Sequence, residues 1–235
     1  MMSAFSTSSV QYLTPLTLAL FEDSGWYKAH YTTSSTSPFG FGAGCDFVYE
    51  DCIKDGVVPN WAKGHFCSDP GDTLQCDATN QNIARCNLVD YNDYLNAVPP
   101  TDQYQYFGPG KETWGGILHT ADYCPMYTAA TTNNGKDDKK ETILMNCNDA
   151  RLESPVVQET FGESSKCYNT NLSRPVCMKT VCDTTAGKVN VIVMDSDGNY
   201  MPPQVCEADG DWMNIPGLGD GSKFECPRFN SICSE

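Results

Sequence analysis

Cysteine and histidine are the residues of this chain with the widest chemistry, because they can form disulfides, bind metals or act as nucleophiles. The 235 residues include 13 cysteines and 3 histidines. The closest two cysteines are Cys177 and Cys182, so the C-x-x-C spacing of zinc fingers does not occur. The histidines are far apart in sequence, at His30, His65 and His119. These spacings favour a disulfide framework over a zinc site.

The density of cysteine also predicts where the protein is found. Disulfide frameworks form in oxidising compartments, so we expect a secreted protein or one on the extracellular cell surface. The sequon Asn171-Leu172-Ser173 predicts glycosylation at Asn171. The first twenty residues lack the basic region that opens a secretory leader. We therefore expect the chain to continue a longer polypeptide, and the odd cysteine count agrees because one cysteine needs a partner elsewhere.

The charge and the motifs exclude several function classes. The net charge is −15, which disfavours binding to nucleic acid or to an anionic membrane. The sequence has no HExxH, GxSxG or Walker motif. Residues 195–199 (DSDGN) partly resemble a calcium loop but lack its closing glutamate, so a hairpin turn is favoured. His119 lies near Asp122, yet no nucleophile accompanies it. We expect this chain to contribute no catalytic residue and no metal ligand.

One helix is predicted over residues 15–24. Thr14 suits the N-cap, Pro15 the first helical position, and Gly25 a left-handed residue after the helix. The three aromatic residues that follow are expected to pack against this helix: Trp26, Tyr27 and Tyr31.

The rest of the chain predicts short strands and irregular segments. Residues 188–194 (KVNVIVM) are the clearest strand, with Asp197-Gly198 as a hairpin turn. Residues 90–114 are tyrosine-rich and interrupted by proline, and we expect them to wrap over the surface as irregular structure. The fold class expected is α+β, mostly β and irregular, with a boundary near residue 51 where cysteines begin to recur.

The N-terminal segment resembles the leishmanolysin-type metzincin peptidases. In that family a methionine turn precedes a helix that ends in F-x-D-x-G-[WF]-Y, a pattern that residues 21–27 (FEDSGWY) match. Gly44-Cys45 and Cys52 match the cysteine pair that follows, although Phe39 stands where the family usually has tryptophan. Residues 121–125 (ADYCP) are a further local match, and the order of the cysteines extends the likeness over the whole chain.

The resemblance implies the C-terminal part of a zinc metalloendopeptidase, from the methionine turn onward. Met2 matches the turn methionine better than its neighbour Met1, and Ser3, Ala4 and Phe5 would line the substrate pocket. The family's three zinc-binding histidines and its general-base glutamate would lie upstream, so the full-length protein would hold one zinc ion that this chain does not ligate. The implied partners are protein or peptide substrates and the missing N-terminal catalytic part, and the chain alone would be inactive.

The resemblance also implies a domain division and a disulfide pattern. Residues 1–51 would be the tail of the catalytic domain, and residues 52–235 a cysteine-rich C-terminal domain. Cys45 would bond to the missing part. The other twelve cysteines would form the pairs Cys52–Cys124, Cys67–Cys86, Cys76–Cys167, Cys147–Cys177, Cys182–Cys233 and Cys206–Cys226.

Two other hypotheses remain open at this point. The chain could be a non-enzymatic, secreted, cysteine-rich adhesion or binding module. It could also belong to an inactive member of the peptidase family that is kept for surface binding. The upstream reading frame distinguishes them, because an HExxH motif there supports the peptidase.

Overall fold

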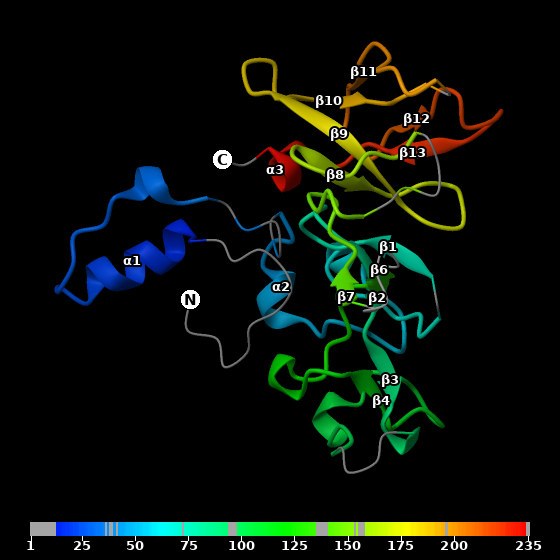
Figure 1. Ribbon diagram of the computed structural model, residues 1–235. Helices are drawn as coiled ribbons and strands as arrows, with labels where there is room; N and C mark the ends of the chain where they lie inside the picture. Colours follow the sequence, from blue (N-terminus) through cyan, green and yellow to red (C-terminus); the bar gives the residue numbers. More distant parts are fainter. Residues whose placement is uncertain are drawn as a thin grey trace.

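A computed structural model describes residues 13–35, 37, 40, 42–71, 73–93, 98–134, 141–152, 154, 158–195 and 197–233. In this part of the chain a helical arm stands to one side of a column of small antiparallel sheets (Figure 1). No helix among the described residues has the length and apolar character needed to cross a membrane.

The arm begins with helix α1 (Pro15–Asp23), as the sequence predicts. The Thr14 hydroxyl accepts a hydrogen bond from the Thr17 N–H at 3.2 Å, which satisfies one of the free donors of the first turn. Proline occupies the first helical position, where its missing N–H costs nothing. Gly25 has a φ of +74°, the left-handed conformation in which glycine commonly ends helices.

The aromatic residues after α1 follow the prediction in part. The ring of Tyr27 meets that of Phe21 edge to face, with 5.6 Å between centroids. The Tyr31 hydroxyl donates to the Glu22 carboxylate at 2.8 Å, so two of the three aromatics do contact the helix. The expectation is wrong for Trp26, which is 84% exposed. Nothing among the described residues covers this indole.

The C-terminal part of the chain forms the largest sheet, with the antiparallel order β11-β10-β9-β8. Its strands are β8 (Ser165–Tyr168), β9 (Val176–Asp183), β10 (Lys188–Ile192) and β11 (Gln204–Cys206). Strand β10 confirms the predicted strand, although it ends two residues earlier. The predicted turn is also confirmed, because Asp195 C=O accepts the Gly198 N–H at 3.1 Å and Met194 pairs with Tyr200.

A second layer packs on this sheet. It consists of the hairpin β12 (Trp212–Asn214) and β13 (Lys223–Glu225), followed by helix α3 (Phe229–Ile232). Alternate residues of β10, Val189 and Val191, are buried against it, as expected of a strand with one face in a core. Tyr168 meets Phe224 edge to face at 5.4 Å between the layers.

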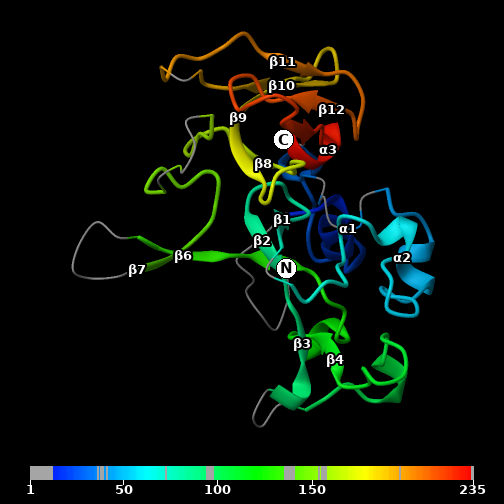
Figure 2. The same cartoon turned by 90° about the vertical axis from the view of Figure 1, so that its right-hand side faces the viewer.

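The middle of the molecule is a three-stranded sheet of order β1-β2-β5. Its strands are β1 (Leu74–Cys76), β2 (Ile83–Cys86) and β5 (Tyr127–Ala129). Two hairpins extend from it: β3 (Leu88–Asp90) with β4 (Trp114–Gly116), and β6 (Thr131–Asn134) with β7 (Glu141–Leu144). Figure 2 shows the β6–β7 hairpin projecting sideways from the column.

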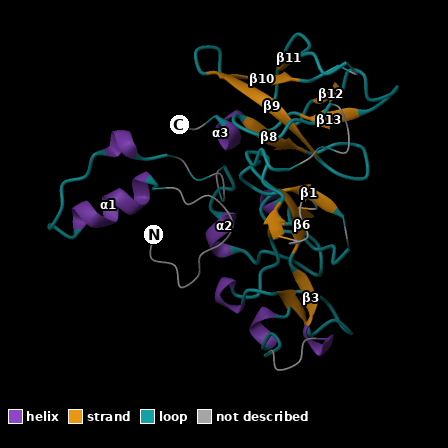
Figure 3. Ribbon diagram, viewed as in Figure 1, coloured by secondary structure: helices purple, strands orange, loops and turns teal. Residues whose placement is uncertain are grey.

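Short helical turns join these pieces (Figure 3). They are η1 (Tyr31–Thr33), α2 (Asp46–Tyr49), η2 (Asn60–Ala62), η3 (Tyr91–Asp93), η4 (Asp102–Tyr104) and η5 (His119–Ala121). Phe47 on α2 packs against Trp61 and Phe66, with ring centroids 6.0 and 6.3 Å away. The domain boundary near residue 51 stays a prediction, and Phe47 shows that side chains pack across that position.

The described residues between 90 and 114 follow the predicted surface wrap only in part. Tyr91 and Phe107 are buried, and the segment ends by entering β4. The Tyr91 hydroxyl donates to Gly116 C=O at 2.9 Å, while Phe107 joins the cluster around Ile53 and Leu88. The irregular and mostly exposed backbone of the described residues is as predicted, but the burial of these two rings is not, because polarity and prolines indicate exposure. Aromatic rings bury a large area even where the backbone is irregular.

Six disulfides connect the sheets, and they are the same six pairs that the family resemblance implies. Their Cα atoms are 5.4–5.9 Å apart, within the range of ordinary disulfides. Cys76–Cys167 ties β1 of the middle sheet to β8 of the C-terminal sheet. The described residues are therefore mostly β and irregular and are held by disulfides, which confirms the expected fold class.

Candidate functional site

The residues predicted to lie nearest the chemistry are Met2, Ser3, Ala4 and Phe5. They lie outside the described residues, so their roles as methionine turn and pocket wall stay predictions. The structure does describe the arm that follows them, and its surface is the first candidate for a functional contact.

The arm exposes an apolar face. Leu16 and Leu20 lie one turn apart on the same side of α1 and are 81% and 61% exposed. Trp26 and Tyr27, just beyond the helix, are also largely exposed. No described residue of α1 is buried. Because burying one such side chain stabilises a protein by about 1.5–3 kcal/mol, a face of this kind indicates a surface that packs against another protein part.

A second exposed feature lies at the end of the arm. Cys45 is free and exposed, and it comes directly before α2. Val48 and Tyr49 on that helix are 74% and 83% exposed. A thiol beside apolar side chains can form an intermolecular or interdomain disulfide if its partner's Cα comes within about 7 Å. This geometry allows the bond that the resemblance implies for Cys45.

The three histidines lie on separate elements. His30 is exposed in the arm, and His119 begins η5. His65 is buried after η2, and its Nδ1 accepts the Gly40 N–H at 3.3 Å. Across the described residues, no group of three or more His, Cys, Asp or Glu side chains could hold a metal ion. The described histidines, cysteines and carboxylates therefore do not fit a zinc site.

A cleft of about 560 Å³ lies between the β1–β2 loop with the segment after η2 on one side and the layer of β13 and α3 on the other. Its charged lining residues are Lys63, Asp77, Asp209, Glu225 and Arg228. His65 and Ser231 also line it. The Ser231 hydroxyl lies 2.7 Å from Arg228 C=O and 3.2 Å from the Asn80 side chain, where it links α3 to the β1–β2 loop. This arrangement can form hydrogen bonds and ion pairs but does not present Ser231 as a nucleophile.

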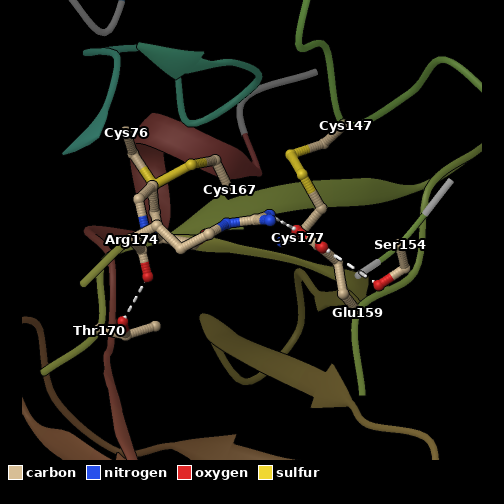
Figure 4. A network of polar contacts seen from close by, with 9 residues as sticks. Cys76, Cys147, Ser154, Glu159, Cys167, Thr170, Arg174 and Cys177 are labelled. Carbon is tan, nitrogen blue, oxygen red and sulfur yellow. Dashed lines mark hydrogen bonds and ion pairs between the residues drawn. A yellow bond between two sulfur atoms is a disulfide. The ribbon is translucent and has the colours of Figure 1, made fainter. Parts of the chain in front are cut away.

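A buried ion pair joins Glu159 to Arg174 beside two disulfides (Figure 4). The Glu159 side chain is fully buried, whereas that of Arg174 is 25% exposed. Glu159 also accepts the Cys177 N–H at 3.0 Å and the Ser154 hydroxyl at 3.1 Å. Burial raises the pKa of Glu159, and Arg174 opposes that rise. Sequence reasoning missed this network because a glutamate and an arginine fifteen residues apart give no periodic signal.

Asp77 is the centre of another buried network. Its carboxylate accepts the Thr79 hydroxyl at 2.9 Å, the Gln81 N–H at 3.0 Å and the Asn82 side-chain amide at 2.7 Å. These bonds close the β1–β2 loop on itself. Asn80 in the same loop donates to Cys167 C=O at 3.0 Å, so the loop also holds the C-terminal sheet. Asp77 thus has a structural role.

The two remaining candidate positions are polar loops on the surface. Asn171 is exposed; its side chain accepts the Lys223 N–H at 2.7 Å and donates to Gly221 C=O at 2.8 Å. Its glycosylation stays a prediction. The Asp195 carboxylate accepts the N–H groups of Asp197 and Asn199, and these bonds lower its pKa. Those contacts are the ones a hairpin turn requires.

Comparison with known proteins places the chain in a family. The family model described as "Peptidase_M8: Leishmanolysin" matches residues 1–235. The leishmanolysin-like peptidase of Drosophila melanogaster is 33% identical over 93% of this chain and 35% of its own length. The leishmanolysins of Leishmania amazonensis and Leishmania major are 27% and 30% identical, over 97% and 94% of this chain.

This chain therefore spans about a third of the length of the curated relatives it matches, 36% and 35% for those two Leishmania proteins. The match covers the arm, α2 and the disulfide-bonded sheets together. The cysteine order and the arm motif that carry the resemblance are distributed over the same range. By this match, the chain belongs to the leishmanolysin family of metallopeptidases.

Proposed function

We propose that the chain is the C-terminal part of a leishmanolysin-like zinc metalloendopeptidase, which hydrolyses peptide bonds in proteins. The observation that carries this proposal is the extent of the match. A match over 93% of this chain covers only 35% of the Drosophila relative, so most of a peptidase of that length is left for a catalytic part. The non-polar arm surface supports it, because such a surface is stabilised when another part covers it.

In this proposal the zinc ligands belong to the preceding part of the polypeptide. The described residues supply no group that could hold a metal. Met2 provides an apolar floor by packing beneath the metal site, a supporting role that needs only its thioether. Ser3, Ala4 and Phe5 border the pocket that receives a substrate side chain.

The arm provides the connection between the two parts. Leu16, Leu20 and Trp26 pack against the catalytic part, and Cys45 forms a disulfide with it. Residues 1–51 then belong to the catalytic domain and residues 52–235 to a cysteine-rich domain. Phe47, which packs on Trp61, fixes the end of the arm to that second domain.

The proposed location is secreted or on the extracellular cell surface. Six disulfides support it, because such bonds persist in oxidising compartments. Asn171 is exposed and accessible to a glycosylating enzyme. The partners are protein or peptide substrates, and the net charge of −15 disfavours nucleic acid.

A peptidase assay tests this function. The 235-residue chain is joined to the upstream region of the Drosophila relative and assayed with casein, with and without a zinc chelator. We expect chelator-sensitive hydrolysis from the joined protein and none from this chain alone or from the Drosophila region alone. A joined protein that is folded and inactive would contradict the proposal and favour a binding module.

A further inference from the structure

Gly40 occupies a position that only glycine fits. Its φ is +78°, and a Cβ there would lie 3.0 Å from the Phe47 ring. Its N–H donates to Nδ1 of His65 at 3.3 Å. The His65 ring in turn meets the Phe47 ring edge to face, with 6.1 Å between centroids. The backbone that leads from the arm is therefore held between a phenylalanine face and an imidazole.

Gly42 lies near Arg228 two residues later. It also has a positive φ, +72°, and a Cβ there would lie 3.6 Å from the Arg228 guanidinium. His65 follows η2 and Arg228 precedes α3, so they come from distant parts of the sequence. Both line the cleft. The end of the arm is thus bonded to His65 at Gly40 and passes beside Arg228 at Gly42.

The Gly40 contact requires a neutral His65. A ring nitrogen accepts a hydrogen bond only when it carries no proton, so Nδ1 must be bare and the proton must sit on Nε2. Protonation of Nδ1 would bring an N–H against the N–H of Gly40. It would also add a positive charge near Arg228. Both effects act in the same direction and weaken the hold on the arm.

The other charged groups around His65 do not reverse this conclusion. Lys63 adds positive charge on the same segment. Asp77, from the β1–β2 loop, is engaged by the donors of its own loop. Asp209, in the loop before β12, and Glu225, on β13, line the cleft from the second layer. The net result is that burial, followed by the charge of Arg228, lowers the pKa of His65 below its ordinary value of 6.5.

We propose that His65 is a pH-sensitive latch that holds Gly40, and with it the end of the arm, beside the cleft. The latch is closed near neutral pH and opens when His65 takes up a proton in acidic surroundings. If the proposed function is correct, the arm carries the methionine turn, so the latch regulates how the catalytic part sits on the cysteine-rich part. The latch itself depends on residues 40–65 and 228, so it can be measured without a peptidase assay.

The experiment follows single amides of the 235-residue chain by NMR hydrogen exchange between pH 7.5 and 4.5. We expect the protection factor of Gly40 to fall at least about tenfold on acidification, as local opening exposes its N–H. The Ser35 amide, which donates to Leu13 C=O within the arm, is the internal control and should keep its protection. His65→Gln retains an acceptor that does not titrate, so its Gly40 protection should stay constant. The matched control His30→Gln, at an exposed histidine, should behave like the wild type.

Two results would overturn the latch. One is a Gly40 protection factor that does not change with pH in the wild type. The other is an equal fall in His65→Gln, which would place the titrating group elsewhere. If that variant does not fold, the wild type still tests the latch. The NMR chemical shifts of the Gly40 amide and of the His65 ring must then change with pH at the same titration midpoint. Neither result bears on peptidase activity, so failure of the latch and failure of the proposed function are separable.

Discussion

Removing Arg174 should expose the energetic cost of burying Glu159. The Glu159 carboxylate has no solvent-exposed surface, and Arg174 is the cation beside it (Figure 4). Arg174→Met keeps much of the side-chain volume and removes the charge. Among the described residues, the donors that then remain to the buried carboxylate are the Cys177 N–H and the Ser154 hydroxyl. We expect the free energy of unfolding at pH 7 to fall by about 3–5 kcal/mol, the usual cost of breaking a buried pair from one side.

The pH dependence identifies the cause. Burial raises the pKa of Glu159 and Arg174 opposes this, so the variant raises that pKa further. A glutamate whose pKa is higher in the folded state than in the unfolded state favours folding while it is protonated. Its contribution is complete below the unfolded pKa of about 4.5 and is lost as the pH rises through the folded pKa. The difference in the free energy of unfolding between the wild type and Arg174→Met should therefore shrink when the pH falls from 7 to 4. It should approach about 1 kcal/mol, the value of the lost hydrogen bonds.

The assay is urea unfolding with the disulfides intact, followed by circular dichroism at both pH values. Glu159→Gln combined with Arg174→Met is the first control, and it should lack the additional pH dependence that Arg174→Met alone acquires. Arg151→Met is the matched control for an exposed pair, because Arg151 and Asp149 have 57% and 21% of their side chains exposed. That variant should lose less than about 1 kcal/mol. A deficit for Arg174→Met that is equal at pH 7 and pH 4 would refute this reasoning.

Two other predictions concern the junction of the sheets. Asp77→Ala removes the acceptor of the buried Asn82 backbone N–H and side-chain amide, so we expect the free energy of unfolding to fall by about 3 kcal/mol and the melting temperature to drop; an unchanged melting temperature would show that water replaces the carboxylate. Replacing Cys76 and Cys167 by alanine opens a loop of 91 residues, which loop-closure entropy values at about 4.5 kcal/mol. Urea unfolding measures this loss, and a loss below about 1 kcal/mol would indicate that the interface holds without the bond.

The local features of the fold were predictable from the sequence where short-range chemistry decides them. Thr14, Pro15 and Gly25 act within one helical turn of their own backbone, so their roles follow from residue type. The strand at residues 188–192 and its turn follow from β-branched alternation and from Asp-Gly. The disulfide pairs followed only from the family resemblance, because spacing alone permits many pairings.

The features that were not predictable depend on contacts between distant segments. Glu159 is buried in contact with Arg174 and with the backbone of Cys177. No sequence pattern links these three residues. Phe107 is buried only because the segment around Ile53 lies beside it. Trp26 stays exposed although Tyr27 and Tyr31 contact α1. Tertiary contacts of this kind override local composition.

Zinc stoichiometry tests the central claim most directly, because the account assigns every zinc ligand to the part that precedes Met2. The 235-residue chain and the same chain joined to the upstream region of the Drosophila relative are dialysed against zinc, and the bound metal is measured by atomic emission. The account predicts about one zinc ion per joined molecule and essentially none on the chain alone. One tightly bound zinc ion on the chain alone would contradict it.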